Sequence, residues 1–354
     1  GLQPIDFDRV VAENQANGVN GSSDIISSSR NSHEWYGILS TYKNKINDDL
    51  TISGGLDARY YVGSHWYQVD DLLGGQFFLD NEDDTYAFGK PLQVGDKYNK
   101  DYDGIVVRSG LFAQAEYQVN ESLNLFMAAD ISNTNYKKEE FMNSEIVGSR
   151  TSKAVDFLGY GIKGGGNYNI DNSHNVFVNV GYFSKAPFLV GVFLNEDTLE
   201  ANAGAENEKV FSAELGYGLR GEKLSANVNV YYTKWLDKTY SGSIGTGESI
   251  FFYNLLGIDA LHQGVEVDFR YKAADDLTLT GMVSLGDWKW ASNVSASVRN
   301  QAGDEVDVVE VFAKDLKVGD AAQTTFALGA DYKLAEKSNI YVDYVFAGDN
   351  YASY

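Results

Sequence analysis

Apolar and polar residues alternate with a period of two over most of the chain. In residues 224–233, leucine, alanine, valine and tyrosine at even positions alternate with serine, asparagine, tyrosine and threonine at odd positions. The alternation recurs in residues 111–119, 123–132, 175–182, 211–219, 265–271, 277–285 and 325–334. Successive side chains of a strand point to opposite faces, so each segment predicts a strand with one apolar and one polar face. We count about twelve such strands, each near the roughly 9–11 residues that a tilted transmembrane strand requires.

The connections between these segments alternate between short and long. Short polar turns are expected at residues 47–49, 120–122, 170–173, 220–223, 273–276 and 335–338, and long loops around residues 63–104, 137–154, 187–206, 238–255 and 293–320. A soluble β-sandwich has no reason to keep its long loops at one end. The pattern predicts an all-β, antiparallel transmembrane β-barrel with tight periplasmic turns and extended outer loops.

The two ends of the chain suggest that further strands belong to this barrel. Residues 1–33 are expected to form another polar outer loop that enters a strand near Trp35, and the chain stops at Tyr354, where another outer loop should begin. Because lipid cannot satisfy an unpaired sheet edge, a stable barrel must close. We therefore expect residues 1–354 to form one partial transmembrane β-barrel domain.

Composition excludes several classes of function. The net charge of −22 disfavours a nucleic-acid partner, which needs a basic face. The chain has no cysteine and four scattered histidines, so neither a metal clip nor a Ser-His-Asp arrangement can be proposed. No apolar run reaches the roughly 20 residues of a membrane helix, and the chain opens Gly1-Leu2-Gln3-Pro4 without a signal peptide. We expect no enzyme activity, cofactor or metal.

Aromatic residues of the long loops are the candidate ligand contacts. They are Trp66 and Tyr67 in one loop, Phe188 and Phe193 in a second, and Phe251, Phe252 and Tyr253 in a third. Such side chains could hold a sugar, a chelate or a peptide by stacking. The alternative, which we favour, is that they anchor the barrel at the membrane interface, as Tyr60, Tyr182 and Tyr232 are expected to do.

Other polar groups have simpler interpretations. The acidic residues 80–84 and Asp304, Glu305, Asp307 and Glu310 could bind Ca²⁺ but match no EF-hand spacing, so solvated loops are the favoured explanation. The run Lys163-Gly164-Gly165-Gly166-Asn167 lies inside a predicted strand and lacks the helix of a phosphate loop. Inward polar residues are expected to be paired with one another or with other parts of the protein; they are Glu116, Asp130, Lys163, Asn167, Glu266, Asp268 and Arg270.

A set of short motifs resembles TonB-dependent receptors, especially those of Bacteroidetes. The segment Asn179-Val180-Gly181-Tyr182-Phe183-Ser184-Lys185-Ala186-Pro187-Phe188 resembles a turn found where a middle strand of those barrels leaves the membrane. Four further segments resemble sequence motifs of the same family and follow one another in the order found there: residues 214–218, 229–235, 262–266 and 285–290. The resemblance implies a barrel of about 22 strands around an N-terminal plug, with a segment that binds TonB. This chain shows neither plug nor coupling segment nor closing strand, so it resembles the second half of such a barrel.

The resemblance implies an energy-coupled importer of a bulky nutrient in the Gram-negative outer membrane. A siderophore, cobalamin, an oligosaccharide or a peptide are the candidate ligands, and TonB, membrane lipid and a surface lipoprotein lid are the implied partners. A passive porin and a surface adhesin or barrel-embedded enzyme are the alternatives. The acidic loops mildly disfavour a strongly anionic ligand, because like charges repel.

Overall fold

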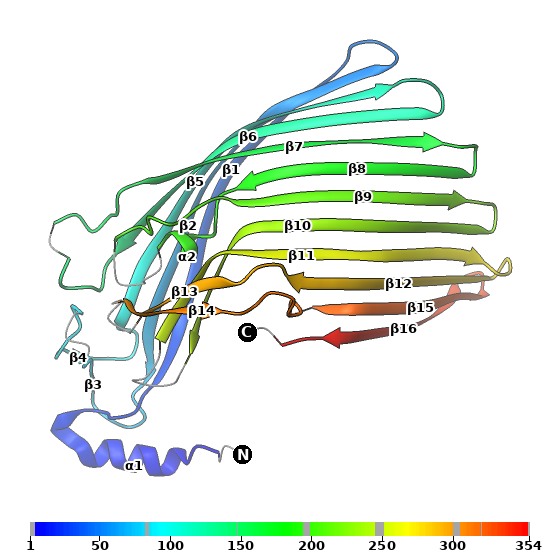
Figure 1. The fold of residues 1–354 in the computed structure, drawn as a ribbon. Helices are drawn as coiled ribbons and strands as arrows, with labels where there is room; N and C mark the ends of the chain where they lie inside the picture. Colours follow the sequence, from blue (N-terminus) through cyan, green and yellow to red (C-terminus); the bar gives the residue numbers. More distant parts are fainter. Residues whose placement is uncertain are drawn as a thin grey trace.

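A single curved antiparallel sheet dominates the computed structural model (Figure 1). The structure describes residues 4–81, 85–146, 148–193, 199–244, 251–299, 305–319 and 321–352. Its helical elements are α1 (Phe7–Asn17), a 3-10 turn (Gly18–Asn20) and α2 (Leu189–Val192). Its strands are β1 (Ile26–Lys45), β2 (Leu50–Asp71), β3 (Phe78–Leu79), β4 (Pro91–Leu92), β5 (Lys97–Gln118), β6 (Leu123–Glu140), β7 (Val155–Asn169), β8 (His174–Lys185), β9 (Glu208–Arg220), β10 (Leu224–Ile244), β11 (Phe251–Lys272), β12 (Leu277–Trp290), β13 (Val294–Arg299), β14 (Glu305–Val311), β15 (Ala322–Ala335) and β16 (Ser338–Asn350).

The sheet follows the order of the chain. Its main path is β1-β2-β5-β6-β7-β8-β9-β10-β11-β12-β15-β16, and every neighbouring pair is antiparallel. The hairpin of β13 and β14 branches from β11 beyond the end of β12, and β3 and β4 form a separate small sheet. The predicted number of long strands is confirmed. Among the described residues, β1 and β16 are the two edges of the path and do not pair with each other.

All six predicted short turns are confirmed, and they lie at one end of the sheet. The long loops lie at the other end, but the predicted bounds are too wide. β2 continues to Asp71 and β5 begins at Lys97, so only residues 72–96 connect them. Likewise, β10 continues to Ile244 and β11 begins at Phe251, so both strands run into the predicted loop. The strands project beyond the segment in which one face is continuously apolar, and there apolar side chains gather in local clusters, one around Val69 of β2 and another around Leu255 and Ile258 of β11.

Residues 1–33 are not simply a polar loop. The α1 helix begins where the Asp6 carboxylate accepts a hydrogen bond from the Arg9 N–H, a typical N-cap contact. The buried Asn14 side chain donates to the carbonyl oxygens of Leu72 and Leu73, each at 3.2 Å, so it holds α1 against the loop end of β2. β1 then begins at Ile26 and includes Trp35, as expected. No helix in the described part of the chain is long and apolar enough to cross a membrane.

One face of the sheet is a continuous apolar surface. Strand register places Leu56, Leu111 and Ile131 side by side on it, and Leu111 is 62% exposed. A row of aromatic residues, the loop-side row, borders this surface toward the long loops; it consists of Tyr36, Tyr60, Tyr160, Tyr182, Phe211 and Tyr232. A turn-side row borders it at the other end and consists of Tyr117, Tyr168, Tyr271 and Tyr332. About eight to ten residues separate the rows, which suits a tilted strand crossing hydrocarbon.

The opposite, polar face is the concave one. The Leu189 side chain of α2 lies over Gly104 of β5, while Gly191 lies against Thr239 of β10. β5 and β10 are separated along the sheet by β6, β7, β8 and β9. One short segment can touch two such distant strands only from the concave side. Gly104 shares its face with Arg108 and the other even-numbered residues of β5, so the polar side chains line the hollow of the sheet.

This assignment of faces predicts opposite responses on one strand. We expect Leu111→Arg to destabilise the protein in a membrane or micelle by about 2–4 kcal/mol, because it places a charge midway between the aromatic rows. Gln114→Arg on the concave face of the same strand is the matched control, and it should leave stability nearly unchanged. Thermal unfolding in detergent measures both. Equal losses in the two variants would contradict the assignment.

Candidate functional site

The seven predicted ligand-contact aromatics do not form one site. Trp66 and Tyr67 lie on β2 rather than in a loop, and as strand neighbours they face opposite sides of the sheet. Lys97 lies over the Trp66 ring at 4.8 Å on the convex side, and Tyr98 lies 6.1 Å from Tyr67 on the concave side.

Of the other two groups of candidate aromatics, one lies in a strand and the other lies in a loop. Phe251, Phe252 and Tyr253 belong to β11, so their loop placement was wrong, and the Phe252 side chain lies outside the described part. Phe188 and Phe193 do flank α2 in a loop, as predicted. Phe188 is 68% exposed, whereas Phe193 is buried.

Residues 187–193, here called the α2 strap, fold into the concave side at its loop end. Val192 and Phe193 pack against Tyr136 and Phe157 of β6 and β7, and Val192 has no exposed surface. The Tyr136 hydroxyl donates a 2.7 Å hydrogen bond to the Pro187 carbonyl oxygen. Burial raises the pKa of Tyr136 to about 12. The strap is thus fixed on one side by an apolar cluster and one buried hydrogen bond.

A lysine–aromatic cluster lies beside the strap on the concave side. Lys185 ends β8, and its Nζ lies 2.6 Å from Glu208 Oε2, 4.9 Å from the centre of the Phe188 ring and 5.6 Å from that of Trp235. Lys238 of β10 lies over the same Trp235 ring at 4.8 Å. We use "lysine–aromatic cluster" for Lys185, Phe188, Glu208, Trp235 and Lys238. A register shift between Trp235 and Lys238 brings both residues to this cluster.

The cluster holds two cations and one carboxylate. Glu208 is buried, and its carboxylate also accepts from the Thr239 N–H at 3.4 Å. Burial lowers the pKa of Lys238; the nearby Glu208 raises it, and Lys185 lowers it further. The local formal charge is therefore +1 in a chain whose net charge is −22. The exposed Phe188 ring, the partly buried Trp235 ring and an excess cation can hold a planar or apolar group that carries negative charge.

A second charged group lies deeper along the concave face. Asp57 of β2 accepts from Arg59 Nε at 2.9 Å and from Arg108 Nη1 at 3.3 Å. The Arg59 guanidinium also lies 5.9 Å from the centre of the Trp35 ring. This group could contact a ligand that has passed the strap, or another part of the protein that enters the hollow.

The predicted inward polar residues mostly pair with neighbours. The Glu116 carboxylate accepts from Gln114 at 2.7 Å, and the Asp268 carboxylate accepts from Asn227 at 3.0 Å. The Asn167 amide donates to Asn169 at 2.9 Å. Lys163 lies within β7 with its three glycines, as predicted. These contacts are structural and nominate none of the residues for catalysis.

The acidic candidates for Ca²⁺ do not assemble. Asp80 is buried and accepts from the Thr85 hydroxyl at 2.9 Å, while residues 82–84 lie outside the described part. Asp304 also lies outside it, and Glu305 accepts from the Ser297 hydroxyl at 2.6 Å. Within the described ranges, no group of three or more His, Asp or Glu side chains is arranged to hold a metal ion.

Sequence reasoning missed four of the five cluster residues. Lys185 and Trp235 stand in motifs that carry the family resemblance, residues 179–188 and 229–235, but those motifs gave no reason to bring them together. Glu208 and Lys238 had no signal at all. Strand pairing, which places Lys185 directly opposite Glu208 and makes β10 the next strand after β9, brings these residues together.

Tyr136→Phe tests how the strap is held. The variant removes one buried hydrogen bond without changing the packed ring, so we expect the strap to open more easily by about 1 kcal/mol. Hydrogen exchange of residues 187–193 should then accelerate about fivefold. Exchange at the wild-type rate would show that the apolar cluster alone holds the strap.

The comparisons with known proteins agree with this architecture. A family model described as "TonB dependent receptor-like, beta-barrel" matches residues 6–354. The fold is similar to that of the copper transporter OprC, with a TM-score of 0.61 and 12% identity over 90% of this chain and 51% of that one. The ferric citrate transporter FecA matches with a TM-score of 0.56 and 10% identity over 90% and 50% of the two chains.

The ferric-catecholate import receptor Fiu from E. coli K12 matches with a TM-score of 0.54 and 11% identity, over 91% of this chain and 44% of that one. The chain thus spans about half the length of the solved structures it resembles, 51%, 44% and 50% of them. No curated protein sequence is significantly similar to it.

Proposed function

Because the chain belongs to the family of TonB-dependent receptor-like β-barrels, we propose that the intact protein is an energy-coupled importer of a bulky nutrient. Its partners are TonB, which supplies the energy, the lipid of the outer membrane and a surface lipoprotein that covers the loop end. The sheet fits this role because its apolar convex face suits lipid and its concave face is polar. The chain provides wall and ligand contacts and breaks no bond.

The lysine–aromatic cluster is the observation that carries the proposal. It lies at the loop end of the concave face, where a ligand arriving from outside first meets the barrel. Its two lysines exceed its one carboxylate, and its Phe188 and Trp235 rings stand beside them. We infer that the ligand carries a ring or other flat apolar surface together with negative charge.

This inference narrows the nutrient class. A negatively charged chelate or peptide fits the cluster better than a neutral oligosaccharide, because an uncharged ligand cannot form an ion pair with the excess lysine. Charge on the acidic loops is screened within about 10 Å, so the nearby lysines outweigh it. The names of the matched structures, a copper transporter, a ferric citrate transporter and a ferric-catecholate receptor, support a metal chelate.

The experiment is a depletion assay on cells. Cells that produce the intact protein are compared with cells that lack it, and solutes removed from the growth medium are identified by mass spectrometry. We expect an anionic solute with a ring to be depleted only when the protein is present, and depletion to stop when a protonophore collapses the energy supply. Depletion that continues with the protonophore would indicate a passive porin and overturn the proposal.

The lowered pKa of Lys238 gives the proposal a pH dependence. Burial lowers this pKa, so as the pH rises Lys238 loses its charge before an ordinary lysine does. An anionic ligand favours the charged form, and its affinity should therefore fall as the pH rises through the lowered pKa. Ligand binding followed from pH 7 upward, at about half-unit steps, measures this. Lys238→Met should bind more weakly at neutral pH and lose the dependence; an unchanged profile would exclude Lys238 from the site.

A further inference from the structure

Two irregularities interrupt the pairing of β10 with β11 beside the lysine–aromatic cluster. Between Trp235 and Lys238, β10 has one residue more than the paired part of β11. Between Lys238 and Thr239, β11 has one residue more than β10. Each extra residue forms a β-bulge. Because the two bulges compensate each other, the strands pair in the same register before the first bulge and after the second.

The backbone is left-handed at both bulges. The φ angle is 56° at Asp237 of β10 and 82° at Gly257 of β11. Such angles are uncommon for residues other than glycine, although aspartate tolerates them better than most. The Asp237 carboxylate accepts from Lys209 Nζ at 2.6 Å, and the Asp237 N–H donates to Asp259 Oδ1 at 3.3 Å. Lys209 lies two residues before Phe211 and shares its convex face, so Asp237 is held on the convex side.

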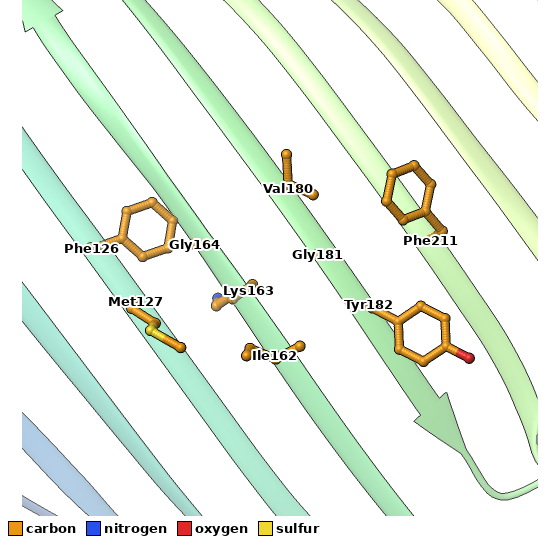
Figure 2. A pocket seen from close by; sticks show the side chains of 9 residues that line it. All are labelled: Phe126, Met127, Ile162, Lys163, Gly164, Val180, Gly181, Tyr182 and Phe211. Carbon is orange, nitrogen blue, oxygen red and sulfur yellow. The ribbon is translucent and has the colours of Figure 1, made fainter.

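The first bulge decides which side chain faces the hollow of the sheet. Residues two apart in a regular strand share a face, as Val180 and Tyr182 of β8 share the convex face (Figure 2). Trp235 faces the hollow, so in a regular strand Asp237 would face it too. Lys238 would then lie on the convex side. The extra residue reverses this, and Lys238 lies over the Trp235 ring at 4.8 Å.

The regular alternative would change the charge of the cluster. Because the register is the same on both sides of the bulges, a regular ladder would place Lys238 opposite Gly257 and move no other part of the two strands. The hollow would then receive the carboxylate of Asp237 instead of the ammonium group of Lys238. Lys185 and Glu208 offset each other, so the formal charge of the cluster would change from positive to negative.

We propose that the two bulges determine the charge selectivity of the lysine–aromatic cluster. They turn Lys238 toward the ligand and Asp237 away from it, so the cluster accepts an anion. Asp237 and Gly257 are positioning residues, because they act through Lys238 and touch no ligand themselves. This inference rests on the proposed function, since it concerns the same ligand site.

Gly257→Val in the intact protein tests the proposal. Valine disfavours the left-handed backbone and favours a regular strand. We expect a crystal structure of the variant to show Lys238 on the convex side and Asp237 in the hollow. Isothermal titration with naphthalene-1,5-disulfonate, a flat aromatic dianion, measures the ligand site. Its affinity should fall about tenfold or more, the loss of one hydrogen bond to a charged group. The fall should be at least as large as in Lys238→Met, because Gly257→Val also brings a carboxylate into the hollow.

Gly95→Val is the matched control. Gly95 also has a left-handed backbone, with φ 98°, and as at Gly257 no described atom lies within 4 Å of an added Cβ. It lies between β4 and β5, away from the cluster, so disulfonate binding should equal that of the wild type.

Deletion of both Asp237 and Gly257 is the rescue variant. It removes both extra residues and leaves Lys238 two positions after Trp235, on the concave face. Its affinity for the disulfonate should stay within about twofold of the wild type. Binding as weak as in Gly257→Val would show that the deleted residues do more than position Lys238, and the proposal would be wrong.

Lys238→Met separates this proposal from the proposed function. If Lys238→Met bound the disulfonate as tightly as the wild type, the cluster would not be an anion site and the proposed function would be contradicted. The crystal structure of Gly257→Val would still decide the role of the bulges. If Lys238→Met bound weakly while Gly257→Val bound like the wild type, or if Gly257→Val kept Lys238 in the hollow, the role of the bulges would be overturned.

Discussion

Replacement of Glu208 by alanine is expected to release the α2 strap and disorder the lysine–aromatic cluster. The Glu208 carboxylate is buried and balances Lys185 at 2.6 Å and the nearby Lys238. Without it, two ammonium groups face each other under the strap. Removal of one partner of a buried pair typically costs 3–5 kcal/mol, but Lys185 is 42% exposed and can turn toward water, so we expect about 2 kcal/mol.

The loss of strap stability in Glu208→Ala should be measurable by hydrogen exchange. About 2 kcal/mol corresponds to roughly 30-fold faster exchange of the amides in residues 187–193. Glu214→Ala is the matched control: it lies on the same strand and the same face, and its carboxylate accepts from Asn179 at 3.1 Å, away from the strap. The proposed role of Glu208 would be contradicted if strap exchange in Glu208→Ala kept the wild-type rate. It would also be contradicted if exchange in Glu214→Ala became faster by the same factor as in Glu208→Ala.

Trp235→Ala should cause the largest loss of ligand affinity. Its ring contacts both lysines of the cluster and offers the broadest flat surface beside them. Truncation of a tryptophan at the centre of a binding site commonly costs 2 kcal/mol or more, so uptake of the nutrient identified by depletion should need about 30-fold more solute for half-maximal rate.

Trp66→Ala is the matched control for that variant. Trp66 also lies beneath a lysine, with Lys97 at 4.8 Å, but on the convex side. We expect its uptake to equal that of the wild type. If Trp66→Ala weakened uptake and Trp235→Ala did not, the ligand would bind outside the hollow of the sheet, and the proposed site would be wrong.

The contrast between these two tryptophans shows what the sequence could predict. Alternation between Leu224 and Thr233 defines a strand and its faces because lipid and polar surroundings impose opposite demands on neighbouring side chains. The short turns follow from the same pattern. Beyond the loop-side row no face is continuously apolar, because apolar side chains form local clusters there instead. The regular alternation is lost, and Trp66 and Phe251 were placed in loops although they belong to strands.

The candidate site depended on contacts that no local pattern contains. Phe188 was predicted as a candidate contact, yet the other residues of the cluster come from β8, β9 and β10. Glu208 and Lys238 meet because β9 and β10 are paired neighbours in the sheet and because a register shift follows Trp235. The strap is a further case, since its anchors Gly104 and Thr239 are far apart along the chain and meet it only across the concave side.

The electrical conductance of the intact protein in a planar lipid bilayer tests the central claim most directly. An energy-coupled importer keeps its passage closed until it is driven, so we predict no steady conductance under an applied voltage, with or without the nutrient. A steady conductance that rises in proportion to voltage would show an open, water-filled pore. That result would contradict energy-coupled import and identify the protein as a passive channel.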